Sequence, residues 1–152
     1  MCLVTTGLLK VEAIPAQLLL DNPYQNVIIS AILVSGGYNG DRLASVEALH
    51  PNGSHICNLP DLPTGRAGHT LDGLTSCGGY DGRRYIDTCV TLSSGQWTQS
   101  HQMIHARPGH TSWSTDNQVY LIGGIGSSET SEILTPGSDT TTKGFKLEYK
   151  TR

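Results

Sequence analysis

Short apolar runs alternate with glycine-containing polar turns along most of the chain. The most apolar run spans residues 27–35, and shorter ones span residues 74–77 and 119–122. Runs this short that stop at glycine predict β-strands rather than helices. The continuous apolar character of residues 27–35 predicts a strand that is covered on both faces. The pattern therefore predicts an all-β chain.

A five-residue pattern returns along the chain at a nearly constant interval. Residues 66–70, Arg-Ala-Gly-His-Thr, recur 41 residues later as Arg-Pro-Gly-His-Thr at residues 107–111. A glycine pair also ends each apolar run, at successive spacings of 42 and 45 residues: Gly36 and Gly37, Gly78 and Gly79, and Gly123 and Gly124. A period of this size indicates a stack or ring of similar units. With about four short strands in each unit, the repeat predicts propeller blades.

The order of these residues resembles the Kelch motif: Arg-x-Gly-His, a strand, a glycine pair, a turn, a strand and an aromatic residue. Trp97 supplies the aromatic residue ten positions before Arg107, Ile56 takes that place before Arg66, and the last unit offers only Phe145. The resemblance implies a partial Kelch-type β-propeller of about three four-stranded antiparallel blades. The units are expected at residues 31–65, 66–106 and 107–152, the last of them incomplete. Residues 1–30 do not match and are interpreted as an atypical N-terminal segment or a degenerate blade strand.

The length of the chain is short for a closed propeller, which uses roughly four to eight blades. An open set of blades leaves two faces and two strand edges uncovered. We therefore interpret the 152 residues as a fragment, a truncated or mispredicted reading frame, or a piece that self-associates to complete a propeller. The 18 glycines explain why hydrophobic residues reach only 37%, since short strands need many turns.

Charge and hydropathy exclude two classes of partner. The net charge is −3 and only 15% of residues are charged, so no basic face for nucleic acid is expected. No apolar run reaches the roughly 18 residues of a membrane-spanning helix. The first residues do not form a convincing signal peptide, because the only early base, Lys10, lies inside the apolar stretch.

The repeated glycine, arginine and histidine residues are interpreted as structural. Glycine permits the sharp exit that each strand requires. We expect His69 and His110 to bond the backbone of the neighbouring unit, and Arg66 and Arg107 to bridge units. No metal or cofactor is expected. His101 and His105 have helical spacing for zinc but no Cys or carboxylate companion, and no copper ligand of the galactose oxidase group can be assigned.

Two features concern the cell compartment. Cys77 and Cys89 flank a turn at residues 82–83 and would lie opposite each other in a hairpin, so they predict a disulfide, with two free buried thiols as the alternative. Asn52 begins an Asn-Gly-Ser glycosylation sequon, although Asn-Gly is also a favoured hairpin turn. Together they favour an extracellular full-length parent over a cytoplasmic one.

The predicted function is a non-catalytic protein–protein interaction module that binds an unknown protein partner through loops between strands. The candidate loops are residues 38–42, 80–84 and 125–129. Residues 126–144 are rich in Ser, Thr and Gly, and Thr140 to Thr142 are expected to belong to a long exposed loop. The alternatives are a piece of a galactose-oxidase-like enzyme propeller and a structural fragment without independent function. The partner-binding candidates are Tyr38, Asn39, Asp41, Arg42, Tyr80, Asp81, Arg83 and Arg84.

Overall fold

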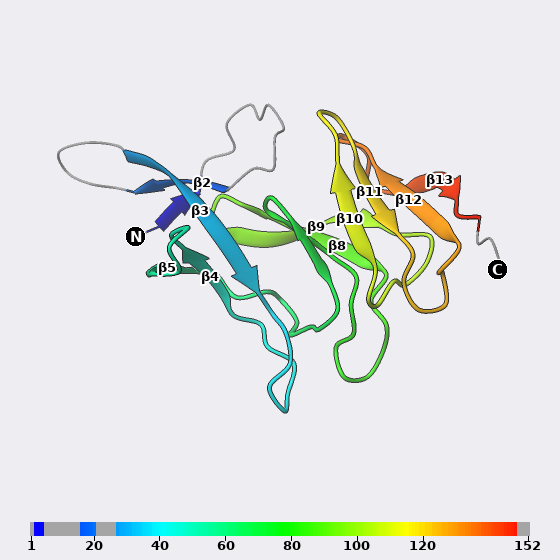
Figure 1. The fold of residues 1–152 in the computed structure, drawn as a ribbon, viewed down its shortest axis with the longest axis horizontal. Helices are drawn as coiled ribbons and strands as arrows, with labels where there is room; N and C mark the ends of the chain where they lie inside the picture. The colour runs from blue at the N-terminus through cyan, green and yellow to red at the C-terminus, as the bar shows by residue number, and fades with distance from the viewer. Residues whose placement is uncertain (1, 5–15, 21–26, 149–152) are drawn as a thin grey trace.

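The chain folds as three antiparallel β-sheets that follow one another in sequence order (Figure 1). The computed structural model describes residues 2–4, 16–20 and 27–148, and these contain no helix. The all-β prediction is therefore confirmed for this part of the chain. The first sheet holds β1 (Cys2–Val4), β2 (Ala16–Leu20), β3 (Val27–Ser35), β4 (Val46–Leu49) and β5 (His55–Leu59).

The second and third sheets each have four strands in simple up-and-down order, as the repeat predicts. Each strand pairs with the next along the chain, and connections of two to ten residues separate them. The second sheet holds β6 (Thr70–Asp72), β7 (Thr75–Cys77), β8 (Thr88–Ser93) and β9 (Gln96–Gln102). The third holds β10 (Thr111–Ser114), β11 (Val119–Ile122), β12 (Thr130–Leu134) and β13 (Thr142–Lys146).

The first sheet differs from the predicted four strands because residues 1–30 contribute to it. The long strand β3 pairs with β2 along residues 27–31 and with β4 along residues 32–35. β1 then adds a fifth strand on the far side of β2. The rest of the predicted atypical N-terminal segment lies outside the described residues.

The prediction that β3 is covered on both faces was wrong for its described side chains. Ala31 is fully buried, but Ile32 and Val34 are 47% and 49% exposed. These two residues point to the face of the first sheet that turns away from the second sheet. The strand β3 thus carries apolar residues on both faces, although one of these faces lies at the end of the row of sheets and is not covered by another sheet.

The hydrophobic core lies between successive sheets rather than inside any one of them. Val46 and Ala48 of β4 pack with Val90 and Leu92 of β8 in the first interface. The second interface joins Cys77 and Cys89 to other buried side chains, which are Met103, Leu121 and Leu134. Each sheet thus buries apolar surface against its neighbour, which is typical of repeat architectures.

The expected exposed loop around Thr140 to Thr142 is partly buried. Thr141 is buried, and its hydroxyl donates a hydrogen bond to Glu132. The backbone N–H of Thr141 also donates to the carbonyl of Gln102 on the edge of the second sheet, at 2.9 Å. The threonine run therefore bridges two sheets, and only its first and last members are exposed.

No helix in the described ranges has the length and apolar character that a membrane crossing requires.

Candidate functional site

The loops that follow the three glycine pairs gather at one end of the row of sheets, at the bottom of Figure 1. Each glycine pair turns the chain out of its strand where another backbone comes very close. Gly79 has a φ of 92°, and a Cβ there would lie 2.8 Å from the carbonyl oxygen of Ala67 in the linker from the first sheet. Only glycine fits such an approach, so the glycine at this position lets the linker and the loop come together.

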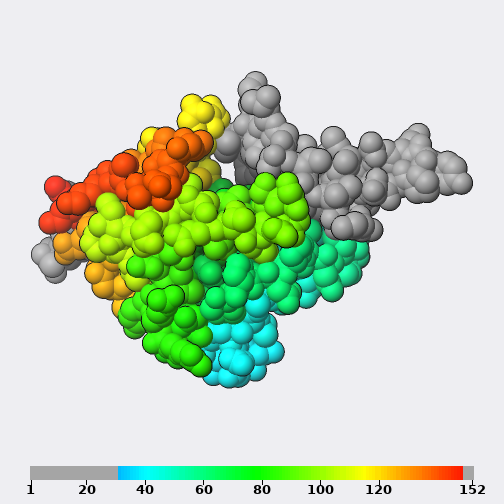
Figure 2. All heavy atoms as spheres, turned by 180° about the vertical axis from the view of Figure 1, so that it is seen from behind, coloured from blue at the N-terminus to red at the C-terminus, as the bar shows by residue number. Residues whose placement is uncertain are grey.

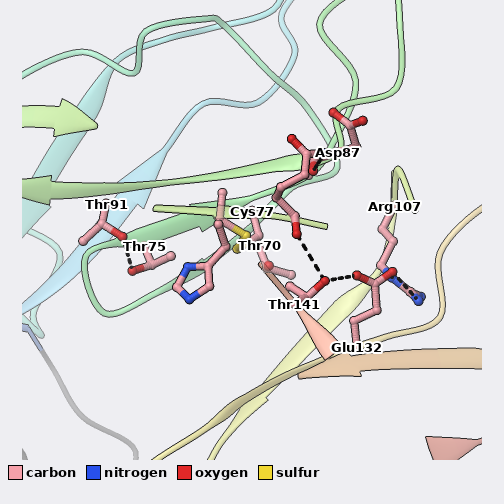
Figure 3. The surroundings of a disulfide bond; sticks show 12 residues. Thr70, Thr75, Cys77, Asp87, Thr91, Arg107, Glu132 and Thr141 are labelled. Carbon is pink, nitrogen blue, oxygen red and sulfur yellow. Dashed lines mark hydrogen bonds and ion pairs between the residues drawn. A yellow bond between two sulfur atoms is a disulfide. The ribbon is translucent and has the colours of Figure 1, made fainter. Parts of the chain in front are cut away.

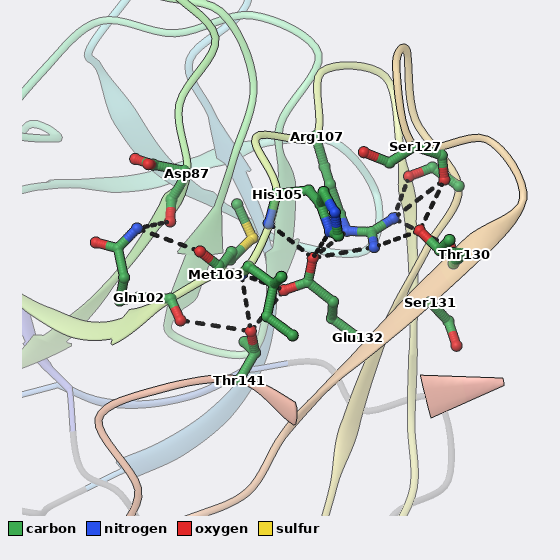
Figure 4. A network of polar contacts seen from close by, with 12 residues as sticks. Asp87, Gln102, Met103, His105, Arg107, Ser127, Thr130, Ser131, Glu132 and Thr141 are labelled. Atoms are coloured by element: carbon green, nitrogen blue, oxygen red, sulfur yellow. Dashed lines mark hydrogen bonds and ion pairs between the residues drawn. The ribbon is translucent and has the colours of Figure 1, made fainter. Parts of the chain in front are cut away.

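Arg107 and Glu132 form a buried ion pair that attaches the third sheet to the linker before it (Figure 4). Both side chains are almost fully buried, with exposed fractions of 0% and 1%, and Arg107 Nη2 lies 3.0 Å from Glu132 Oε1. Arg107 also donates to the carbonyl oxygens of Gly123 and Thr130, at 2.7 and 3.0 Å. The carboxylate accepts from the backbone N–H groups of Ile104 and His105, and from Thr141 Oγ1 at 2.5 Å.

The surroundings of Glu132 keep it ionised. Burial opposes the charge, but hydrogen bonds from Thr141 and the Ile104 N–H, with the positive charge of Arg107, outweigh it and lower the pKa of Glu132. A buried carboxylate that accepts several hydrogen bonds and an arginine is a satisfied structural anion. Nothing in the sequence pattern predicts this role for Glu132.

Arg66 occupies the matching place before the second sheet but has a different environment. It is 3% exposed and donates to the carbonyl oxygens of Thr64 and Gly78, at 3.3 and 3.4 Å. The register explains the difference. Glu132 pairs with a residue two positions before a glycine pair, and Val90 holds the equivalent position in the second sheet. Burial lowers the pKa of Arg66, and the charge of Asp81 opposes that shift.

The two repeated histidines join neighbouring sheets, but through hydroxyl groups rather than the predicted backbone of the neighbouring unit. His69 Nε2 lies 2.8 Å from Ser35 Oγ, and His110 Nε2 lies 2.8 Å from Thr70 Oγ1. His110 also bonds through Nδ1 to the carbonyl of Arg107 in its own linker. Burial, helped by the charge of Arg66, lowers the pKa of His69 to about 4. Burial also lowers the pKa of His110, so in both rings burial opposes the charged form.

Trp97 links the second sheet to the linker that precedes it. Its indole Nε1 donates to the carbonyl oxygen of Pro60 at 2.7 Å, and its ring packs on the core between the first two sheets. Trp97, the aromatic residue of the repeat, thus stabilises the contact between the first and second units. Indole N–H groups usually find such a partner when they are buried.

Cys77 and Cys89 form a disulfide, which confirms the predicted pairing over two free thiols. They are directly opposite each other on β7 and β8, with a Cα–Cα distance of 4.1 Å. Figure 3 shows the bond in the core between the second and third sheets, beside Thr70 and close to Arg107 and Glu132. The bridge fastens the central strands of the second sheet.

Four side chains on the first two loops form an exposed cluster, which we call the tyrosine–arginine cluster: Tyr38, Arg42, Tyr80 and Tyr85. The guanidinium of Arg42 lies 4.5 Å from the ring centre of Tyr38 and 4.8 Å from that of Tyr80. Tyr80 and Tyr85 meet edge to face, with ring centres 5.5 Å apart. Tyr38 and Tyr85 remain 62% and 52% exposed. Figure 2 shows the two loops, in cyan and bright green, side by side on one edge of the molecule.

The cluster combines predicted and unpredicted residues. The sequence predicts Tyr38, Arg42 and Tyr80 as candidates, whereas Tyr85 lies just outside the predicted loop of residues 80–84. The signal for Tyr85 was present, because a second tyrosine ends the same loop that Tyr80 begins. Asn39 and Asp41 are exposed beside the cluster.

The second loop is held in shape by its own carboxylate. Asp81 Oδ1 accepts from the backbone N–H groups of Arg83 and Arg84, at 2.7 and 2.8 Å. These hydrogen bonds lower the pKa of Asp81. The side chains of Arg83 and Arg84 are exposed, and Arg84 Nε lies 3.8 Å from Asp81 Oδ2, so the loop offers an ordered backbone with two exposed positive charges.

The third loop does not join the cluster. Ile125 is 65% exposed, and the backbone N–H of this residue is bonded to the carbonyl of Pro108. Glu129, at the far end of the loop, pairs with Lys146 on β13 at 3.6 Å. No aromatic or arginine side chain lies on this loop, so its chemistry differs from that of the first two.

The sequon residue Asn52 lies on an exposed turn, as expected. Its side-chain oxygen accepts hydrogen bonds from the backbone N–H and hydroxyl of Ser54, at 3.0 and 2.8 Å. Gly53 adopts a φ of 86°, which is the conformation of a hairpin turn. An exposed hairpin turn is compatible with both interpretations of this sequence, a glycosylation sequon and a favoured turn.

The histidines with helical spacing are separated by the fold. His101 lies on β9 and bonds the carbonyl of Thr135, whereas His105 lies in the following linker and contacts Glu132. Within residues 31–148, no group of three His, Cys, Asp or Glu side chains is arranged to hold a metal ion.

Comparison with known proteins gives one informative similarity. Over 119 residues, the chain is 34% identical to the spermatocyte protein spe-26 of Caenorhabditis elegans, and the match covers 72% of this chain. No family model matches the chain. The matched region spans about a fifth of the length of spe-26, at 21%.

Proposed function

We propose that the chain is a non-catalytic protein-interaction module, built as a partial Kelch-type propeller, that binds a protein partner through its first two loops. The three antiparallel sheets support this proposal, as do the glycine pairs and the repeated roles of arginine and histidine between sheets. The similarity to spe-26 agrees with it but names no partner.

The tyrosine–arginine cluster carries the proposal. Tyrosine and arginine are enriched among the residues that contribute most to protein interfaces, because they offer large contact area together with hydrogen-bonding groups. Arg42 is already held between Tyr38 and Tyr80, so little side-chain freedom is lost when a partner binds. Rings that pack among themselves and stay half-exposed are poorly explained by folding alone.

The loops that carry the cluster are also prepared for binding. Both loops are bonded at one end to the linker between the first two sheets, through Gly37 N–H to the carbonyl of Arg66 at 2.8 Å and through the pair Ala67 and Tyr80 at 2.9 and 3.0 Å. Asp81 fixes the backbone between the two tyrosines. A preorganised surface of this kind binds without a large ordering cost.

The test is a quantitative affinity capture from cell extract with three immobilised proteins: the wild type, a double variant Tyr38→Ala/Tyr85→Ala, and the control Ile104→Ala. Ile104 is 45% exposed but lies in the linker between the second and third sheets. Removing both rings should weaken binding of a genuine partner by roughly 30-fold, the equivalent of about 2 kcal/mol. The proposal fails if every captured protein binds the double variant as well as it binds the control.

A further inference from the structure

The two ends of the row of sheets expose apolar surfaces that are not equivalent. We define the leading face of a sheet as the one turned towards the preceding sheet, and the trailing face as the one turned towards the next. In both internal interfaces, the trailing face of one sheet packs on the leading face of the following sheet. The first sheet therefore has an unpaired leading face, and the third sheet an unpaired trailing face.

The trailing face of the third sheet is aromatic. Trp113 on β10 lies opposite Tyr120 on β11, which lies opposite Ile133 on β12, so the three side chains share one face. The ring centres of Trp113 and Tyr120 are 5.5 Å apart, and those of Tyr120 and Phe145 are 6.2 Å apart. Trp113 and Phe145 are 59% and 46% exposed, so a continuous aromatic stripe is open to solvent.

The leading face of the first sheet is aliphatic and carries an acid. Ile32 and Val34 are half-exposed on β3, and Val34 lies opposite Glu47 on β4. By register, Glu47 is the counterpart of Glu132, because each pairs with the residue two positions before a glycine pair. In the part of the chain that the structure describes, the side chain of Glu132 holds Arg107, whereas the side chain of Glu47 has neither an ion pair nor a hydrogen bond.

We propose that the trailing face of one copy of the chain packs on the leading face of a second copy, head to tail. The aromatic stripe of Trp113, Tyr120 and Phe145 then covers Ile32 and Val34, in the orientation that the chain already uses twice. This contact continues an established interface, since only the identity of the two sheets changes. It involves different residues from the tyrosine–arginine cluster and does not depend on the proposed partner binding.

The chemistry of the two faces favours this pairing over one leading face packing on another. Aromatic rings pack well on aliphatic side chains and contribute much of the energy at interfaces. Two leading faces would bring two Glu47 carboxylates together in a desolvated contact, which is costly. A head-to-tail contact between two copies closes into a ring where the rotation permits and otherwise continues as a filament.

The test is light scattering of the purified full chain over the micromolar range, with variants of each face. Trp113→Glu alters the trailing face, Val34→Glu alters the leading face, and Ile125→Glu, on a loop at a residue that is 65% exposed, serves as the control. All three positions are exposed, so thermal unfolding checks that each variant keeps its fold. The wild type and the control should reach at least twice the monomer mass of 16.3 kDa, and both face variants should be monomers.

A mixing experiment separates head-to-tail contact from other arrangements. Equal amounts of the two face variants should associate, because the intact leading face of Trp113→Glu meets the intact trailing face of Val34→Glu. Association of the mixture into dimers supports the proposal. The proposal is overturned if the wild type is a monomer or if the mixture stays monomeric. It is also overturned if Trp113→Glu abolishes association and Val34→Glu does not.

Discussion

Replacing Glu132 by glutamine should strongly destabilise the fold, because it leaves Arg107 buried without a negative partner. Arg107 is fully buried, and its Nε and Nη2 both lie 3.0 Å from one oxygen of Glu132. The other oxygen accepts from Ile104 N and Thr141 Oγ1, and a glutamine NH₂ group cannot accept there. Breaking a buried pair in this way costs about 3–5 kcal/mol.

The chain supplies a matched control in Glu47→Gln. Glu47 has the same place in the register, but its side chain makes no hydrogen bond or ion pair within the described residues. Its substitution should therefore change the free energy of unfolding by less than about 0.5 kcal/mol. The assay is urea unfolding at pH 7, followed by the fluorescence of the two tryptophans. Since domains are stable by about 5–15 kcal/mol, a loss of this size will shift the midpoint clearly. Equal stabilities for the two variants would refute the assigned role of Glu132.

The same pair predicts the pH dependence. The pKa of Glu132 is lowered from 4.5 in the folded chain, so its contribution is complete above pH 4.5 and is lost as the pH falls through the folded-state pKa. The difference in stability between the wild type and Glu132→Gln should therefore shrink on acidification below pH 4.5. A difference that stays constant down to pH 2.5 would contradict an ionised Glu132.

Three further predictions concern single features. Replacing Cys77 and Cys89 by alanine should cost about 2–4 kcal/mol in urea unfolding, and an unchanged midpoint would show that the disulfide does not stabilise the chain. Because the pKa of His69 falls from 6.5 to about 4, the folded chain should lose stability as the pH drops from 6.5 towards 4, and His69→Gln should flatten this slope; equal slopes would contradict the prediction. Gly79→Ala should destabilise more than Gly82→Ala in thermal unfolding, since both have positive φ but only Gly79 has backbone within 3 Å of a Cβ; equal losses would exclude the close approach.

Local patterns in the sequence predict most of the strands, because strand length and glycine turns are encoded within a few residues. The repeat interval predicts where each sheet begins, and the turn at residues 82–83 predicts that Cys77 faces Cys89. These inferences need only the period of two in a strand and the position of a turn.

Features that depend on contacts between sheets were harder to predict. Nothing in the spacing shows that Glu132 meets Arg107, because residue 90 in the preceding unit is valine and breaks the repeat. The burial of Thr141 depends on the same carboxylate. The exposure of Ile32 could not be predicted from an apolar run, since the run does not show which face of the strand another sheet covers.

The tyrosine–arginine cluster could be predicted only in part, because its contacts also depend on the arrangement of the sheets. The glycine pairs mark the loops, so Tyr38, Arg42 and Tyr80 were identified from their positions. Their contact is made between two loops that are about 40 residues apart in sequence, and only the arrangement of the sheets brings Arg42 over Tyr80.

Hydrogen exchange of the chain, measured alone and with a captured protein partner, tests the proposed binding surface most directly. Binding through the tyrosine–arginine cluster should slow amide exchange in residues 38–42 and 80–85, and leave the linker around Ile104 and the edge strand β13 unchanged. Protection confined to β13 or to that linker, with both loops unaffected, would contradict binding through these loops.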